Sequence, residues 1–141
     1  MEITSLHKKY PDANMKKYNI VIDNRRHIVR VTHVGDLDIS TAKELVTEAR
    51  TKAYNLGYNL LYDFRESFIK VSTTEMYFLP REHDLLAIPK ATHLKSANII
   101  PLKDKKVDWR FFEVTAQNAG LNLRAFKKEE DALKWLEGDN T

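Results

Sequence analysis

The sequence predicts a single α/β domain built on a mostly parallel five-stranded sheet, with an antiparallel hairpin at its N-terminal end. Short β-rich runs alternate with segments of helical periodicity, which is typical of parallel strands joined by crossover helices. Only a short polar turn separates the first two β-rich runs. The 141 residues fit one domain, and an apolar content of 43% is enough to form one core.

The hairpin is predicted from the first two β-rich runs. Residues 17–22 are rich in β-branched and aromatic side chains, and residues 27–34 alternate between two faces. Between them, residues 23–25 carry an Asp-Asn signal, because both residues tolerate left-handed backbone angles. We therefore expect one antiparallel pair at an edge of the sheet.

The first helix is predicted over residues 42–56, where the apolar residues change to helical spacing and fall on one face. Gly57 is a natural stop for this helix. The candidate N-caps are Asp38, Ser40 and Thr41, the last of which matches a capping box with Glu44.

Six further elements complete the order β-β-α-β-α-β-α-β-α. Residues 58–64 form a short apolar run, as expected of a strand buried on both faces. Ser72 and Glu75 match a second capping box, and Pro80 ends or kinks the helix that they open. The remaining predictions are strands at 97–102 and 121–126, a helix with an inner face at 111–119 that Asp104 or Asp108 caps, and a last helix at 129–136.

The composition favours a cytoplasmic protein. Cysteine is absent, which excludes disulfides and thiolate chemistry. No run approaches the ~20 apolar residues of a membrane span, and residues 1–14 lack the apolar core of a signal peptide. The net charge of +3 is spread over short basic pairs, whereas nucleic-acid-binding proteins gather their charge on one face. We expect neither membrane insertion nor a nucleic-acid partner.

We expect three segments along the chain: an irregular leader at 1–15, the domain at 16–137 and a frayed polar tail at 138–141. No catalytic constellation is identifiable within them. The chain has no P-loop, no nucleophile elbow and no G-x-G-x-x-G, and its five histidines form no H-x-x-x-H pair. The sequence therefore predicts a protein that is not an enzyme and that holds neither cofactor nor metal.

The first candidate site is the start of the second helix, at Ser72, Thr73 and Thr74. The simpler interpretation is that these hydroxyls cap the first N–H groups of the helix. The functional alternative is a phosphorylation or anion site, because the N-terminus of a helix favours negative charge and Lys70 stands close by in the sequence.

The second candidate site is a group of charged residues at strand ends. Asp63, Arg65 and Glu66 follow the third predicted strand, and Lys103 follows the fourth. Ligands of open parallel sheets gather outside the carboxyl ends of the strands. The simpler interpretation is a solvated salt-bridge cluster of little energetic value.

The third candidate site is an apolar groove, because the second and third helices carry more apolar residues than one buried stripe needs. A surplus of this kind marks a partner surface or a ligand groove, with ordinary core packing as the alternative. Residues 80–93, interrupted by prolines, could form a lid over it. The groove residues are Met76, Phe78, Leu85, Leu86 and Ile88.

The element order and the run 111–136 resemble the SpoIIAA-like branch of the STAS superfamily, the fold of the anti-sigma-factor antagonists. In that branch a helix with an aromatic-Glu pair closes at Asn-x-Gly, and a strand ending in Phe leads to an Ala-x-x-Trp-Leu helix. The matching positions here are Phe112-Glu113, Asn118-Ala119-Gly120, Phe126 and Ala132-Leu133-Lys134-Trp135-Leu136. The segment LLYDFRES at 60–67 is also similar, and the resemblance covers residues 18–136.

The resemblance implies a non-enzymatic regulatory module that binds another protein. In the antagonists a partner kinase phosphorylates a serine of an Asp-Ser-Ser-Gly motif at the start of the second helix. Ser72 or Thr73 stands at that place, whereas Lys70 stands near the Asp position and no Gly follows. The alternative function is binding of a small apolar ligand or lipid, because the layout also resembles the lipid-binding lobe of CRAL-TRIO proteins. A homodimer is compatible with either function.

Overall fold

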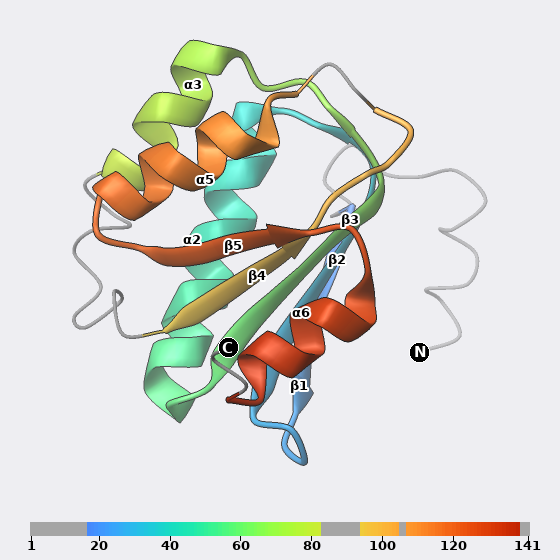
Figure 1. The fold of residues 1–141 in the computed structure, drawn as a ribbon, viewed down its shortest axis with the longest axis vertical. Coiled ribbons are helices and arrows are strands. Elements are labelled where there is room, and N and C mark those ends of the chain that lie inside the picture. Colours follow the sequence, from blue (N-terminus) through green and yellow to red (C-terminus); the bar gives the residue numbers. More distant parts are fainter. Residues whose placement is uncertain (1–16, 83–93, 105–106, 139–141) are drawn as a thin grey trace, which may run out of the picture.

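The strands and helices of this chain alternate as the sequence predicts. The computed structural model describes residues 17–82, 94–104 and 107–138, and Figure 1 shows their arrangement. The elements in chain order are β1 (Tyr18–Asp23), β2 (Ile28–Leu37), α2 (Ile39–Leu56), β3 (Asn59–Ile69), α3 (Thr73–Phe78), the short 3-10 helix η1 (Leu79–Arg81), β4 (Lys95–Ile99), α5 (Trp109–Asn118), β5 (Asn122–Phe126) and α6 (Glu129–Leu136).

The five strands form one sheet in the order β1-β2-β3-β4-β5. β1 pairs with β2 antiparallel, and the three other pairings are parallel. This confirms the predicted mostly parallel sheet with an antiparallel N-terminal hairpin. The crossovers place α2, α3 and α5 over one face of the sheet and leave α6 on the other face (Figure 1).

The turn of the hairpin is held by the side chain of its first residue. Asp23 Oδ1 accepts hydrogen bonds from the backbone N–H groups of Arg25 and Arg26, at 3.1 and 3.0 Å. His27 then adopts a left-handed backbone with a φ of 58°, and its ring stacks on that of Tyr58 at 4.9 Å. The Asp-Asn signal thus forms the turn that the sequence predicts.

Helix α2 begins and ends at residues singled out in the sequence. Of the three candidate caps, Asp38 is the N-cap, because its Oδ1 accepts the backbone N–H of Thr41 at 2.8 Å. The expected box of Thr41 with Glu44 is therefore not the cap of this helix. Gly57 ends α2 in the left-handed conformation at a φ of 73°, as predicted.

The strands β2 and β3 are longer than the sequence predicts, because they continue to Leu37 and Ile69 instead of ending near residues 34 and 64. A shift of register between Thr32 and Val34 lets their pairing continue to the Leu37–Ile69 pair. Beyond this shift the strands lose the apolar pattern that marks burial on both faces. Asp63, Arg65 and Glu66 consequently lie inside β3 and not after it.

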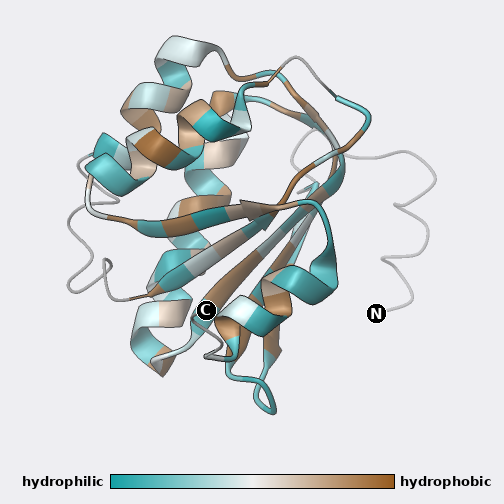
Figure 2. Cartoon of the chain, viewed as in Figure 1, coloured by the Kyte–Doolittle hydropathy of each residue, from teal (hydrophilic) through white to brown (hydrophobic). Residues whose placement is uncertain are grey.

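The core is divided by the sheet into a large and a small part. The larger part lies under α2, α3 and α5, and the smaller part lies under α6. Figure 2 shows the apolar stripes of the strands between these two layers of helices. Along β3, Leu60 and Tyr62 belong to the large core whereas Leu61 belongs to the small one, as expected from alternation along a strand.

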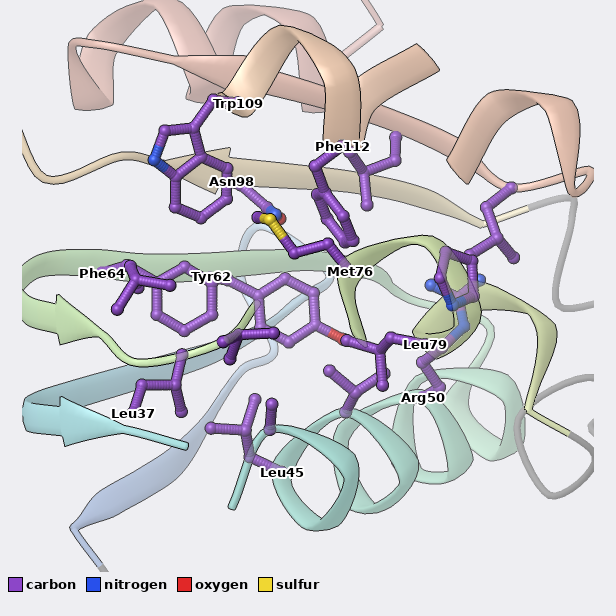
Figure 3. A pocket seen from close by; sticks show the side chains of 17 residues that line it. Leu37, Leu45, Arg50, Tyr62, Phe64, Met76, Leu79, Asn98, Trp109 and Phe112 are labelled. Atoms are coloured by element: carbon purple, nitrogen blue, oxygen red, sulfur yellow. The ribbon is translucent and has the colours of Figure 1, made fainter. Parts of the chain in front are cut away.

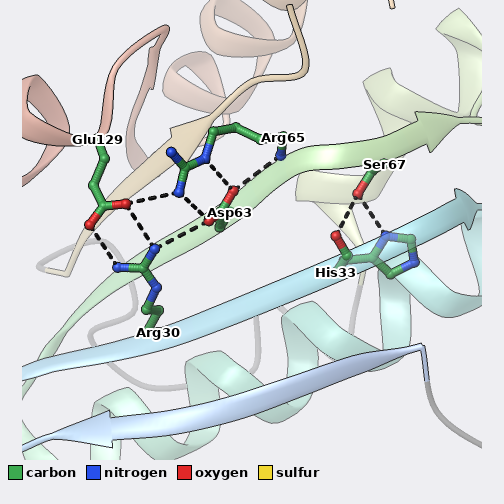
Figure 4. Close-up of polar contacts among 6 residues, drawn as sticks. All are labelled: Arg30, His33, Asp63, Arg65, Ser67 and Glu129. Atoms are coloured by element: carbon green, nitrogen blue, oxygen red, sulfur yellow. Dashed lines mark hydrogen bonds and ion pairs between the residues drawn. The ribbon is translucent and has the colours of Figure 1, made fainter. Parts of the chain in front are cut away.

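One polar pair is buried in the long β2–β3 ladder (Figure 4). The Ser67 hydroxyl donates to the carbonyl oxygen of His33 at 3.1 Å, so His33 Nδ1, 2.7 Å from Ser67 Oγ, is the donor to that oxygen. Burial lowers the pKa of the fully buried His33 ring, and Lys17 adds to this effect while Asp38 and Asp36 oppose it. The ring is therefore neutral in the folded protein, with a hydrogen on Nδ1.

We predict that the protein loses stability as the pH falls below about 6.5, the ordinary pKa of histidine. The lowered pKa of His33 means that the unfolded state binds a proton more readily than the folded state does, so acid favours unfolding. Urea unfolding at pH 7.5 and at pH 5 measures this loss.

The His33→Gln variant should lose less of its stability than the wild type over this pH interval, even if it is less stable at pH 7.5. His27→Asn is the matched control, because His27 is exposed and Asn tolerates its backbone angle. An equal loss of stability in His33→Gln and in the wild type would contradict the assignment.

Candidate functional site

A cavity of about 60 Å³ lies between the sheet and the helices α2, α3 and α5 (Figure 3). Its wall is mostly apolar, and it is contributed by strands, by all three helices and by η1. The residues that carry this apolar character include Leu37, Leu45, Phe64, Met76, Leu79 and Phe112. The cavity is larger than the ~10–15 Å³ that one water molecule needs.

Polar atoms also border this apolar space. The Tyr62 hydroxyl, Asn98 Oδ1 and Trp109 Nε1 are buried and have no hydrogen-bond partner within the part of the chain that the structure describes. The guanidinium of Arg50, which is 1% exposed, donates from Nη1 to Ser96 Oγ at 2.8 Å. Burial raises the pKa of Tyr62 to about 12 although the nearby Arg50 opposes the rise. The tyrosine is therefore protonated and able to donate.

Register places two of these polar side chains next to each other. Tyr62 of β3 and Asn98 of β4 are partners in the parallel ladder, so their side chains lie on the same face of the sheet. Each is only 3% exposed, and Figure 3 shows both among the side chains that surround the cavity. Polar residues in two predicted buried strands were the signal that sequence reasoning overlooked.

The two described residues of the predicted apolar groove lie on different sides of α3. Met76 lines the cavity, as expected. Phe78 does not, because it lies two residues further along α3 and therefore on another face, where 56% of the side chain is exposed. The other predicted groove residues, Leu85, Leu86 and Ile88, lie outside the described residues, as does most of the expected lid.

The predicted strand-end cluster is found on the opposite face of the sheet, in a network of four charged side chains (Figure 4). Arg65 donates to Asp63 from Nε at 3.0 Å and from Nη2 at 2.7 Å. Arg30 of β2 lies 3.2 Å from Asp63 and 3.0 Å from Glu129, the first residue of α6. Glu129 is also 2.9 Å from Arg65. The network therefore ties α6 to β2 and β3.

The charges of this network cancel one another, since it holds two arginines and two acids. Burial raises the pKa of Asp63, but the hydrogen bonds and charges of Arg65 and Arg30 outweigh it and keep that pKa below its ordinary value. The hydrogen bond from Arg30 likewise lowers the pKa of Glu129. A neutral, internally satisfied network fits a structural role better than a ligand site.

Of the residues predicted for this cluster, Asp63 and Arg65 contact each other, whereas Arg30 and Glu129 were not predicted for it. Arg30 and Glu129 are 99 residues apart in the chain, so no local pattern joins them. Glu66 and Lys103, which were predicted for this cluster, are exposed and lie outside the four-residue network.

The start of α3 has the capping box that the sequence predicts. Ser72 Oγ accepts the backbone N–H of Glu75 at 3.1 Å, and the Ser72 N–H donates to the Glu75 carboxylate at 2.9 Å. Thr73, Thr74 and Lys70 are exposed around it. The hydroxyl of Ser72 is thus used as a cap, and a phosphorylation or anion site at this place stays a prediction.

Comparison with known proteins identifies the fold. No family model and no curated protein matches the sequence. The structure is similar to an uncharacterized DUF3478-family protein with a SpoIIAA-like fold from Shewanella loihica PV-4, with 18% identity, a TM-score of 0.52, and coverage of 89% of this chain and 98% of that one. The anti-sigma factor antagonist SpoIIAA in its unphosphorylated form also matches, with 15% identity, a TM-score of 0.47, and coverage of 86% and 98%.

This chain therefore has an α/β structure with the SpoIIAA-like fold that the sequence predicts. On this fold the chain carries the cavity under α3 and the four-residue charge network under α6. Over the described ranges, no helix is long and apolar enough to cross a membrane.

We predict that Asp63→Asn lowers the free energy of unfolding by about 1–3 kcal/mol, because Arg30 and Arg65 lose a charged acceptor that is largely buried. Urea denaturation at pH 7 measures the effect. Glu66→Gln, an exposed change outside the network, should stay within about 0.5 kcal/mol of the wild type. Equal stability of the two variants would show that the network is solvated and contributes nothing.

Proposed function

We propose that this chain is a non-enzymatic regulatory module of the STAS type, which binds another protein through the outer surface of α3. The observation that carries the proposal is the exposure of two neighbouring aromatic residues on that helix. Tyr77 is 41% exposed and Phe78 is 56% exposed, and their rings contact each other edge to face at 5.1 Å. Aromatic side chains that remain exposed together are typical of protein-binding surfaces.

The aromatic pair stands on a surface that is held in place by an arginine. Arg81 Nη1 donates to the carbonyl oxygen of Tyr77 at 2.7 Å and to Thr115 Oγ1 of α5 at 2.8 Å. The guanidinium also lies 4.0 Å from the centroid of the Tyr77 ring. Val114, beside Thr115 on α5, is another exposed apolar residue. Aromatic residues with an adjacent arginine have the composition of interface hot spots.

Ser72 is our proposed point of regulation for this surface. It caps the same short helix that carries Tyr77 and Phe78. A phosphate would add a charge of about −2 at the cap, next to the Glu75 carboxylate that now accepts the Ser72 N–H. Repulsion between the two would disturb the first turn of α3 and, with it, the binding surface.

We predict that Phe78→Ser weakens partner binding at least ~10-fold, since truncation of a hot-spot residue typically costs about 2 kcal/mol or more. Affinity capture with quantitative mass spectrometry compares wild type, Phe78→Ser and Val21→Ser, in which another exposed apolar residue, on β1, is changed. We expect one protein to be retained by the wild type and by Val21→Ser but lost from Phe78→Ser. A capture that is empty, or indifferent to Phe78, would contradict the proposal.

Two substitutions distinguish the role of Ser72 as a helix cap from its proposed role in regulation. Ser72→Ala should lower the stability of the protein by about 1 kcal/mol, because it removes the cap, whereas Ser72→Asp keeps an oxygen for the Glu75 N–H and adds a negative charge beside the Glu75 carboxylate. If charge at this position regulates binding, Ser72→Asp should still reduce partner capture. Capture by Ser72→Asp equal to that by the wild type would leave the hydroxyl a helix cap without a regulatory role.

The second candidate function is binding of a small apolar ligand, which the cavity under α3 favours. At about 60 Å³ the cavity matches a compact molecule rather than a whole acyl chain. We predict that native mass spectrometry of freshly purified protein at low micromolar concentration shows a retained small mass. An apo mass that does not change after incubation with lipids and small aromatic compounds would count against this function.

A further inference from the structure

The polar atoms that border the cavity without a hydrogen-bond partner lower the stability of the folded protein. A buried donor or acceptor without a partner costs about 1–3 kcal/mol relative to a satisfied one. The Tyr62 hydroxyl and Asn98 Oδ1 are both in this position within the described residues. Phenylalanine and leucine would fill similar volumes at these sites without the penalty. The guanidinium of the nearby Arg50 can donate to the oxygen of Tyr62, but it accepts no hydrogen bond, so it leaves the Tyr62 O–H without an acceptor.

The Tyr62 hydroxyl and Asn98 Oδ1 together fit one functional group of a ligand. The Tyr62 hydroxyl can donate a hydrogen bond, and Asn98 Oδ1 can only accept one. Because Tyr62 and Asn98 are register partners on adjacent strands, their Cα atoms are only about 5 Å apart. A hydroxyl group that reaches both side chains would accept from Tyr62 and donate to Asn98, which would satisfy both.

The remainder of the cavity selects for a hydrocarbon body of limited size. Leu45, Met76 and Phe112 face the space from three different helices. An engineered cavity of about 150 Å³ binds benzene, and the cavity here is about 60 Å³. A ring therefore enters only if a neighbour shifts, and Met76 is suited to this because its side chain is unbranched and adaptable.

We infer that the cavity is a binding site for a compact, largely apolar molecule with one hydroxyl group, which Tyr62 and Asn98 recognise together. The inference rests on the second function proposed above and names the chemical class of its ligand. The hydroxyl lies between β3 and β4, and the apolar part of the ligand lies against α2, α3 and α5.

Phenol and benzene are suitable probes, because they share a ring and differ by the hydroxyl. The full-length chain, labelled with ¹³C at its methionine methyl groups, is titrated with each compound. The chain has three methionines, and Met76→Leu identifies the signal of Met76. We expect a saturable shift of the Met76 signal, with phenol bound at least ~10-fold more tightly than benzene, as the two added hydrogen bonds provide.

Two variants test whether Tyr62 and Asn98 bind the hydroxyl group of phenol. Tyr62→Phe and, independently, Asn98→Leu should reduce the preference for phenol to about onefold to threefold while benzene still binds. Tyr54→Phe is the matched control, because it removes a hydroxyl from an exposed tyrosine outside the cavity, and should keep the full preference. Thermal unfolding of each variant verifies that the comparison is made on folded protein.

The outcomes distinguish this inference from the function on which it rests. Equal binding of phenol and benzene, or a preference for phenol that survives in both Tyr62→Phe and Asn98→Leu, would leave apolar-ligand binding in place and overturn recognition of the hydroxyl. If neither compound shifts the Met76 signal, both the recognition of a hydroxyl and the proposed apolar-ligand function are overturned. Ordered water would then be the hydrogen-bond partner of the Tyr62 hydroxyl and of Asn98 Oδ1.

Discussion

The parallel pairing of β2 with β3 is the constraint from which the other features of this molecule follow. Its register brings Arg30 to Asp63 on one face of the sheet and His33 within hydrogen-bond distance of Ser67 on the other. The irregularity between Thr32 and Val34 allows both of these contacts within one continuous ladder. Because β3 also pairs with β4, the same ladder fixes the position of the polar atoms that border the cavity.

The two faces of the sheet satisfy their polar groups in opposite ways. Under α6, each charged group of the network meets an opposite charge, and Glu129 joins the last helix to the central strands. Under α2, α3 and α5, apolar packing stops short of filling the space, and Tyr62 and Asn98 are left beside the cavity. The closed network holds the scaffold together, whereas the incompletely packed face has the properties of a binding site.

Local chemistry made the helix ends predictable, whereas strand ends and the site depended on distant partners. Ser72 and Gly57 act through atoms a few residues away, so the sequence alone located the caps of α3 and α2. The continued pairing of β3 depends on one extra residue that it carries between Asp63 and Glu66 relative to β2, which is visible only when the two strands are aligned. Phe78 looked like a groove residue by composition, but the short α3 turns it outward. Tyr62 and Asn98 gain their significance only when β3 and β4 are placed side by side.

Helix α3 has only six residues, and its two sides face different surroundings. Met76 lies against the cavity, while Phe78, roughly 200° further around the helix axis, lies in solvent. Because both side chains stand on one short helix, a change in the orientation of α3 would move both. An occupant that favours one orientation of α3 and a partner that favours the same one must strengthen each other's binding by an equal factor, because thermodynamic coupling is reciprocal.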